Sequence, residues 1–146
     1  MIATVLLTLT LNLILTAPAN FRATIPAGRV LSDALTWDNI RAEILKCDIQ
    51  FPEIVMLQIR LESANLTSRL CKVNNNLLGM HYPKKRPTMA KGKVKSNGMA
   101  HYDCWQDCIR DYKAWQDYMY KGGDYLTFLS RVYATDIYYV SKLKRL

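Results

Sequence analysis

An almost uninterrupted apolar segment, which begins at Pro52 and ends at Glu62, restricts the fold of this chain more than any other feature. A helix that is apolar on nearly every side must be covered by other elements, so this segment predicts a central buried helix. Pro52 suits its first turn, where the missing amide hydrogen costs nothing. The sequence therefore predicts a mainly α domain packed around this helix. Its apolar interior positions are Ile54, Val55, Met56, Leu57, Ile59 and Leu61.

Glu62 is the one carboxylate at the C-terminal end of that apolar segment. The unpaired carbonyls at a helix C-terminus and the apolar neighbours both disfavour a negative charge, so we expect the pKa of Glu62 to be raised. A carboxyl group that keeps its proton near neutral pH can act as a general acid. The alternative is a solvated residue at a helix end, or an ion-pair partner of Arg60 or Arg69.

The chain has 146 residues, half of them apolar, and a formal net charge of +8. This length and composition suit one compact domain with a real core. The charge should attract a polyanion, which leaves nucleic acid, an acidic membrane and an anionic cell wall as partner classes.

The first residues are apolar and uncharged, and a small-residue pattern at Ala17-Pro18-Ala19 follows them. We interpret residues 1–19 as a signal peptide or signal-anchor, although the first basic residue is only Arg22. Residues 20–35 then form a linker, and residues 36–146 form the domain. This division predicts a secreted, periplasmic or cell-envelope protein whose N-terminal segment engages a membrane only for export.

Pro and Gly residues interrupt the segment from Met80 to Tyr102, which has no Asp or Glu. Its composition predicts a small basic β-hairpin lobe, which is either a solvated surface or a contact for an anionic polymer. The basic residues of this lobe are Lys84, Lys85, Arg86, Lys91, Lys93 and Lys95.

The remainder of the domain is predicted to be helical, with a first helix near Thr36. Asp103 can cap a helix over about 104–121, and Gly122-Gly123 ends it. Another helix begins at Asp124 or Tyr125 and runs through Val132, and Asp136 can cap a last helix toward Leu143.

Four cysteines, Cys47, Cys71, Cys104 and Cys108, could pair in an exported chain or remain free thiols. A zinc site formed by His101, Cys104 and Cys108 with His81 is an alternative, but the paired spacing typical of such sites is absent. We therefore expect no metal.

Four elements in order resemble a known family: Pro52 to Ser63, Asn75-Asn76-Leu77-Leu78-Gly79, Tyr102 to Tyr112, and Tyr133-Ala134-Thr135-Asp136. Together they resemble the bacterial peptidoglycan endo-beta-N-acetylglucosaminidases of glycoside hydrolase family seventy-three. The resemblance covers about Thr36 to Leu143. It implies a lysozyme-like α+β fold in which the basic lobe flanks a cleft.

The resemblance also implies a hydrolase that cuts the peptidoglycan glycan strand after N-acetylglucosamine, and we expect a monomer that needs no cofactor. It places the catalytic acid on Glu62 and a cleft tyrosine on Tyr133. The Asn-Asn-Leu-Phe-Gly element of the family falls on Asn75 to Gly79, with Leu78 in place of Phe. Asp136 lies in the last element and is interpreted as structural. The residues expected to contact substrate are Asn75, Asn76, Tyr102, Lys84 and Lys85, the lysines suiting carboxylates of wall peptides.

Glycoside hydrolysis normally uses two carboxyl groups, yet the lobe offers no acid as a partner for Glu62. The acetamido group of the substrate could attack instead, Tyr133 could orient water, or Asp103 could turn toward the cleft. We favour the first two together. Three other functions stay open: a lytic transglycosylase, a non-catalytic wall-binding module, and a nucleic-acid binder, which the resemblance argues against.

Overall fold

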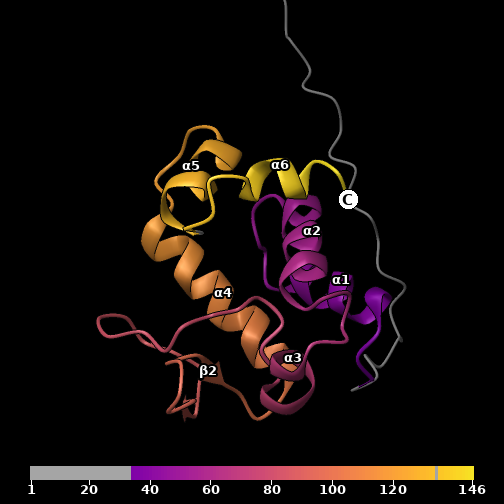
Figure 1. Cartoon of the computed structure of the whole chain (residues 1–146), viewed down its shortest axis with the longest axis vertical. Coiled ribbons are helices and arrows are strands. Elements are labelled where there is room, and N and C mark those ends of the chain that lie inside the picture. Colours follow the sequence, from indigo (N-terminus) through magenta and orange to yellow (C-terminus); the bar gives the residue numbers. More distant parts are fainter. Residues whose placement is uncertain (1–33, 134) are drawn as a thin grey trace, which may run out of the picture. The chain divides into compact units, whose positions relative to one another are not determined.

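Six helices and one two-stranded sheet make up the part of the chain that the computed structural model describes, residues 34–133 and 135–146 (Figure 1). The predicted signal segment 1–19 and most of the predicted linker 20–35 lie outside these residues. No helix in the described ranges is both long and apolar enough to cross a membrane. The elements in chain order are α1 Trp37–Lys46, α2 Pro52–Glu62, α3 Arg69–Asn74, β1 Gly92–Lys93, β2 Ala100–His101, α4 Trp105–Met119, α5 Tyr125–Val132 and α6 Tyr139–Leu143.

Helix α1 begins where the sequence predicts, because Thr36 caps it. The Thr36 hydroxyl accepts a hydrogen bond from the Asn39 backbone amide at 3.3 Å. The Asn39 side chain in turn donates to the carbonyl of Ala34 at 2.9 Å, and Leu35 packs against the core. The last two residues of the predicted linker thus contact the domain.

Helix α2 is the central helix, and Pro52 occupies its first turn as predicted. Val55 and Ile59 face one hydrophobic cluster, which α1 and α4 also form. Ile54, Leu57 and Leu61 are half-buried against a second cluster, which α5 and α6 form. Because the two clusters lie on different sides of α2, the helix needs apolar residues almost all round.

Two aspartates, Asp103 and Asp136, were predicted as helix caps, and Asp124 or Tyr125 was predicted to begin a helix. Asp124 Oδ1 accepts from the Thr127 amide at 2.7 Å and caps α5. Asp103 does not cap α4, because Cys104 is the N-cap residue and Asp103 forms an ion pair with Lys91 at 2.9 Å instead. Asp136 precedes the N-cap of α6, Tyr138, and accepts from its amide at 2.8 Å.

The predicted basic hairpin is present and lies beside the start of α4 (Figure 1). β1 and β2 pair antiparallel, with Gly92 opposite His101. A buried ion pair fastens the lobe to α4: Arg86 donates to both carboxylate oxygens of Asp111, at 2.8 and 2.9 Å. Burial alone would raise the pKa of Asp111, but the hydrogen bonds and charge of Arg86 lower it.

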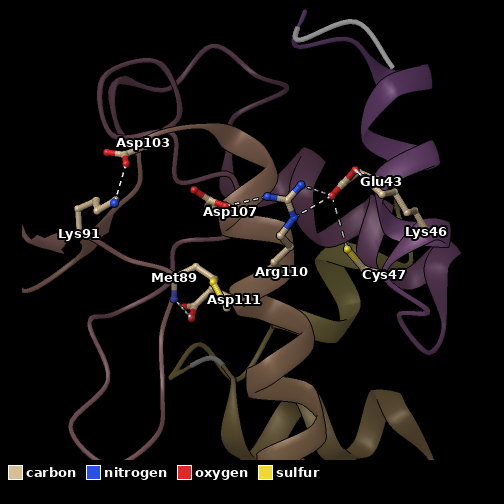
Figure 2. A network of polar contacts seen from close by, with 9 residues as sticks. All are labelled: Glu43, Lys46, Cys47, Met89, Lys91, Asp103, Asp107, Arg110 and Asp111. Carbon is tan, nitrogen blue, oxygen red and sulfur yellow. Dashed lines mark hydrogen bonds and ion pairs between the residues drawn. The ribbon is translucent and has the colours of Figure 1, made fainter. Parts of the chain in front are cut away.

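A second ion cluster holds α1 against α4 (Figure 2). Glu43 of α1 is almost fully buried, and its Oε1 accepts from Arg110 Nε at 3.1 Å. Arg110 also donates to Asp107 at 2.9 Å. Figure 2 shows this cluster beside the Lys91–Asp103 pair and the Met89 amide, which donates to Asp111 at 3.1 Å. Buried charges of this kind fix the helices only while both partners are present.

The four cysteines are all free thiols. Burial raises the pKa of Cys108 to about 12, and its sulfur accepts from the Leu77 amide at 3.3 Å. Within residues 34–133 and 135–146, no group of three or more His, Cys, Asp or Glu side chains is placed to hold a metal ion. The alternative zinc site at His81, His101, Cys104 and Cys108 therefore has no such arrangement.

Candidate active site

A cavity of about 650 Å³ lies at the C-terminal end of α2. This volume falls in the range typical of small-molecule sites. Its walls come from the end of α2, the start of the lobe, α4, the segment after α5, and α6. The lining residues are Leu61, Glu62, Gly79, Met80, His81, Tyr82, Pro83, Arg86, Met99, Trp115, Val132, Tyr133, Thr135, Asp136, Tyr139 and Lys142.

The turn after α2 explains why this helix stops at the cavity. Ser63 is fully buried, and its hydroxyl donates to the Ile59 carbonyl and accepts from the Leu66 amide at 2.8 Å. Ala64, Asn65 and Leu66 follow with φ of 48°, 55° and 67°, a left-handed turn that no right-handed helix can continue into. Glu62 is therefore held in the last turn, at the cavity wall.

Glu62 has the environment expected of a proton donor. Burial raises its pKa, and a hydrogen bond with the Tyr139 hydroxyl opposes that shift in part. No ion pair to Glu62 occurs among the described residues. Arg60 and Arg69, the alternative partners, are exposed, and the Arg60 guanidinium lies over the Trp37 ring at 5.2 Å.

Gly79 leaves the space that the Glu62 carboxyl group occupies. A Cβ atom at residue 79 would lie 3.0 Å from Glu62 Oε2, and the residue has a φ of +61°. Both the contact and the left-handed backbone favour glycine. The Asn75 to Gly79 element thus contributes to the site through its backbone.

A row of buried polar side chains continues behind Glu62 and joins four helices. Gln58 Nε2 donates to the Tyr139 hydroxyl at 3.2 Å, and the Tyr112 hydroxyl donates to Gln58 Oε1 at 2.6 Å. The Tyr112 and Tyr125 hydroxyls are 2.7 Å apart, and Gln116 Nε2 donates to Tyr125 at 2.8 Å. Tyr139 is a site residue that the sequence analysis missed, because nothing in the sequence distinguishes it from exposed Tyr138.

Tyr133 lines the same cavity as Glu62, where the resemblance led us to expect it. Its hydroxyl donates to the carbonyl of Leu78, and its ring lies 5.1 Å from that of Trp115. Burial and the nearby Glu62 raise the pKa of Tyr133 well above its ordinary value. Tyr133 is therefore a neutral phenol with an oxygen lone pair still free to accept a hydrogen bond.

Three residues expected to contact substrate lie away from this cavity. Asn76 is fully buried and donates to the carbonyls of Met80 and Ala100, both at 2.9 Å. Asn75 donates to the backbone of Tyr102 and Asp103. Tyr102 is 4% exposed and donates to Asp111 at 2.9 Å. The polar groups of these three residues form hydrogen bonds within the protein, so the expectation that they contact substrate has no support from their positions. The sequence does not show which way the side chain of a turn residue points.

The predicted substrate contacts Lys84 and Lys85 lie beside the main cavity. They line a second, shallower groove of about 320 Å³, together with Pro83, Arg86, Trp115, Tyr118 and Met119. Pro83, Arg86 and Trp115 also line the main cavity. The role of Arg86 in both was not foreseen, although it is the one arginine among the lobe's lysines.

Asp136 is the second carboxylate that lines the cavity among the described residues. Hydrogen bonds from Lys142 and the Tyr138 amide lower its pKa, whereas burial raises the pKa of Glu62, so the two carboxyl groups are shifted in opposite directions. Asp103, the other acid considered, is held by Lys91 and does not line the cavity.

Comparisons with known proteins agree with this architecture. Residues 38–146 match the model of the Glucosaminidase family, described as mannosyl-glycoprotein endo-beta-N-acetylglucosaminidase. No curated protein gives a significant match.

Two solved structures are similar to the described domain. The catalytic domain of the autolysin Auto from Listeria monocytogenes is 24% identical, with a TM-score of 0.51 over 75% of this chain and 78% of that one. A chain of a type VI secretion system effector–immunity complex from Pseudomonas protegens is 19% identical, with a TM-score of 0.58 over 74% of this chain and 86% of that one. At these identities the likeness concerns the fold, and it confirms the predicted mainly α, lysozyme-like class.

Proposed function

The chain belongs to the glucosaminidase family, and from this premise we propose that it hydrolyses the glycan strand of peptidoglycan after N-acetylglucosamine, with Glu62 as the general acid. The Listeria structure in the comparison is that of an autolysin, which supports peptidoglycan as the substrate. The place of action would then be outside the cell or in the cell envelope.

The observation that carries this proposal is a carboxyl group with a raised pKa inside a cavity of about 650 Å³. A glycosidic oxygen is a poor leaving group until it is protonated, so cleavage near neutral pH needs an acid that still holds its proton. Burial shifts the pKa of Glu62 in the direction that this requirement demands.

In the first step, Glu62 gives its proton to the glycosidic oxygen while the carbonyl oxygen of the sugar's own acetamido group attacks C1. The C1–O bond breaks, and the leaving sugar departs as an alcohol. In the second step, water attacks C1 and gives a proton back to Glu62. The acetamido group is released, and the net change is the addition of one water.

Tyr133 and Asp136 would assist this chemistry without titrating. The free lone pair of the Tyr133 oxygen can accept a hydrogen bond from water or from the acetamido N–H, which makes the acetamido oxygen a better nucleophile. The ionised Asp136 can stabilise positive charge that develops on the sugar ring, although its ion pair with Lys142 reduces this effect.

The decisive test is Glu62→Gln, which keeps the shape of the side chain but replaces the carboxyl group with an amide that has no acidic proton to give. We expect release of reducing ends from purified peptidoglycan to fall by about 10² to 10⁴, the usual contribution of a general acid. Glu53→Gln is the matched control, because Glu53 is an exposed carboxylate of the same helix. Wall digestion that survives Glu62→Gln in a folded protein would rule out the assignment.

Mass spectrometry of the wild-type products tests the reaction type. Hydrolysis after N-acetylglucosamine leaves that sugar as a reducing end. A lytic transglycosylase, which can also act with one acid, would leave an anhydromuramic end instead. Binding to the wall with no product at any pH would indicate a non-catalytic module.

A further inference from the structure

The groove beside the main cavity is positioned to hold a side branch of a glycan strand that is bound in the cavity. It lies between the lobe and one side of α4, and it adjoins the cavity, since Pro83, Arg86 and Trp115 line both. A strand that places a sugar linkage at Glu62 can therefore extend a side branch into the groove without leaving the protein surface.

One side of the groove carries positive charge. Lys84 and Lys85 are both exposed, and neither ammonium group has an ion-pair partner within residues 34–133 and 135–146. No Asp or Glu lines the groove in the same ranges. Two other cations of the same lobe are paired, Lys91 with Asp103 and Arg86 with Asp111. The two lysines are thus available to an anionic ligand.

The opposite side of the groove is apolar and open to solvent. Tyr118 is 51% exposed and Met119 36% exposed, and Trp115 is half-buried at the junction with the cavity. Aromatic and thioether surfaces of this kind suit small aliphatic groups such as the methyl groups of alanine.

We propose that this groove is a subsite for the peptide stem of peptidoglycan, with stem carboxylates against Lys84 and Lys85 and alanyl methyl groups against Tyr118 and Met119. Few other ligands combine carboxylates, methyl groups and a covalent link to the sugar bound in the adjoining cavity. The inference rests on the proposed function for the identity of the glycan, and it adds that the enzyme prefers strands that still carry peptides.

The test measures binding separately from turnover. In a Glu62→Gln background, which should leave the wall intact, sedimentation assays compare Lys84→Gln/Lys85→Gln with Lys93→Gln/Lys95→Gln. The control variant removes the same charge from two exposed lysines of the lobe that line neither the main cavity nor the groove. Each variant is assayed on intact peptidoglycan and on glycan freed of peptides by an amidase, which leaves the lactyl carboxylate on the sugar.

We expect the Lys84/Lys85 variant to bind intact peptidoglycan roughly three to ten times more weakly, as two partly exposed ion pairs would allow. Its binding to peptide-free glycan should match that of the control. Tyr118→Ala should reproduce the selective loss, whereas Tyr138→Ala, an exposed tyrosine outside the groove, should not.

Equal losses on both glycans would overturn the subsite, because the groove would then hold sugar. A control that loses as much as the Lys84/Lys85 variant would also overturn it, since charge alone would explain the effect. These results do not depend on catalysis. A wild-type protein that releases no reducing ends would refute the proposed function, while the difference in binding would still decide the subsite.

Discussion

The proton affinity of Glu62 is set by two opposed contributions that can be changed one at a time. Burial raises the pKa, and the Tyr139 hydroxyl lowers it by donating to the carboxylate. With Glu62 as the proposed general acid, the alkaline limb of the rate profile should follow its pKa, since activity would be lost when Glu62 is ionised before substrate binds.

Tyr139→Phe should move this alkaline limb to higher pH, because it removes the donor that favours the charged form. The substitution also leaves the buried Gln58 amide without an acceptor, at a cost of about 1 to 3 kcal/mol in the free energy of unfolding. The pH dependence of kcat/KM and denaturant unfolding measure the two effects. Tyr138→Phe should change neither, and a limb that stays in place in Tyr139→Phe would refute the contribution of this hydroxyl.

Single residues were predictable where their chemistry depends on position along a helix. Glu62 follows from the end of an apolar segment, and the direction of its pKa shift follows from burial. The partners of Asn76 and Tyr102 could not be predicted, because a turn amide or a phenol can face either a cavity or the backbone. Tyr139 and Arg86 become recognisable only when elements distant in sequence meet.

At the scale of elements, the lobe is held on α4 by one fully desolvated ion pair. Arg86 and Asp111 have side chains 5% and 0% exposed, and Tyr102, the Met89 amide and the Thr88 side chain supply further hydrogen bonds to the carboxylate. Since Arg86 also lines both the cavity and the groove, this pair fixes one wall of each.

Asp111→Asn should destabilise the domain by roughly 3 to 5 kcal/mol, the usual cost of leaving a buried charge unpaired. Asp117→Asn on the same helix breaks an exposed pair with Lys113 and should cost about 0.3 to 0.5 kcal/mol. Urea unfolding followed by circular dichroism gives both values. Similar small losses in the two variants would show that the Arg86–Asp111 pair does not hold the lobe.

The same pair gives the stability a defined dependence on pH. The pKa of Asp111 is lowered in the folded state, so its contribution is complete above the ordinary aspartate pKa of 3.8 and is lost as the pH falls below it.

Five of the six described helices were predicted in place and order where local signals fix them, such as Thr36 and Asp124 as caps and Pro52 in a first turn, while the short helix α3 was not predicted. The first residues of α4 and α6 could not be predicted, because neither helix has a side-chain cap. Asp103 and Asp136 were therefore wrongly assigned as their caps. The basic hairpin followed from its glycines and prolines, but its attachment through Arg86 did not, because an ion pair between distant segments leaves no periodic pattern.

For the whole molecule, the net charge of +8 should govern how strongly the protein collects on an anionic wall. Raising the salt concentration from about 0.1 M to about 1 M shortens the screening length from about 10 Å to about 3 Å. Binding of the Glu62→Gln variant to intact wall should therefore weaken steadily over this range. Sedimentation measures it, with an unchanged circular dichroism spectrum as the control. Salt-independent binding would mean that apolar and hydrogen-bonded contacts dominate.

With the side-chain amides of Gln58 and Gln116 oriented as in the structure, the hydrogens in the row of polar side chains behind Glu62 follow one consistent direction. Tyr139 accepts from Gln58, so its own proton points at Glu62. The Tyr112 hydroxyl donates to Gln58, so in this arrangement the Tyr125 hydroxyl donates to Tyr112.

Tyr125 in turn accepts from Gln116, whose own oxygen accepts from the Gln50 amide at 2.9 Å. From Gln116 to Tyr139, each bond along the row therefore has its positive end directed toward Glu62, while the Gln116 amide also donates to the Gln50 carbonyl at 3.0 Å. In the proposed reaction, the anion that Glu62 becomes on releasing its proton would meet an electric field already oriented to receive it, so charge could separate in a buried place without first reorganising the surrounding protein.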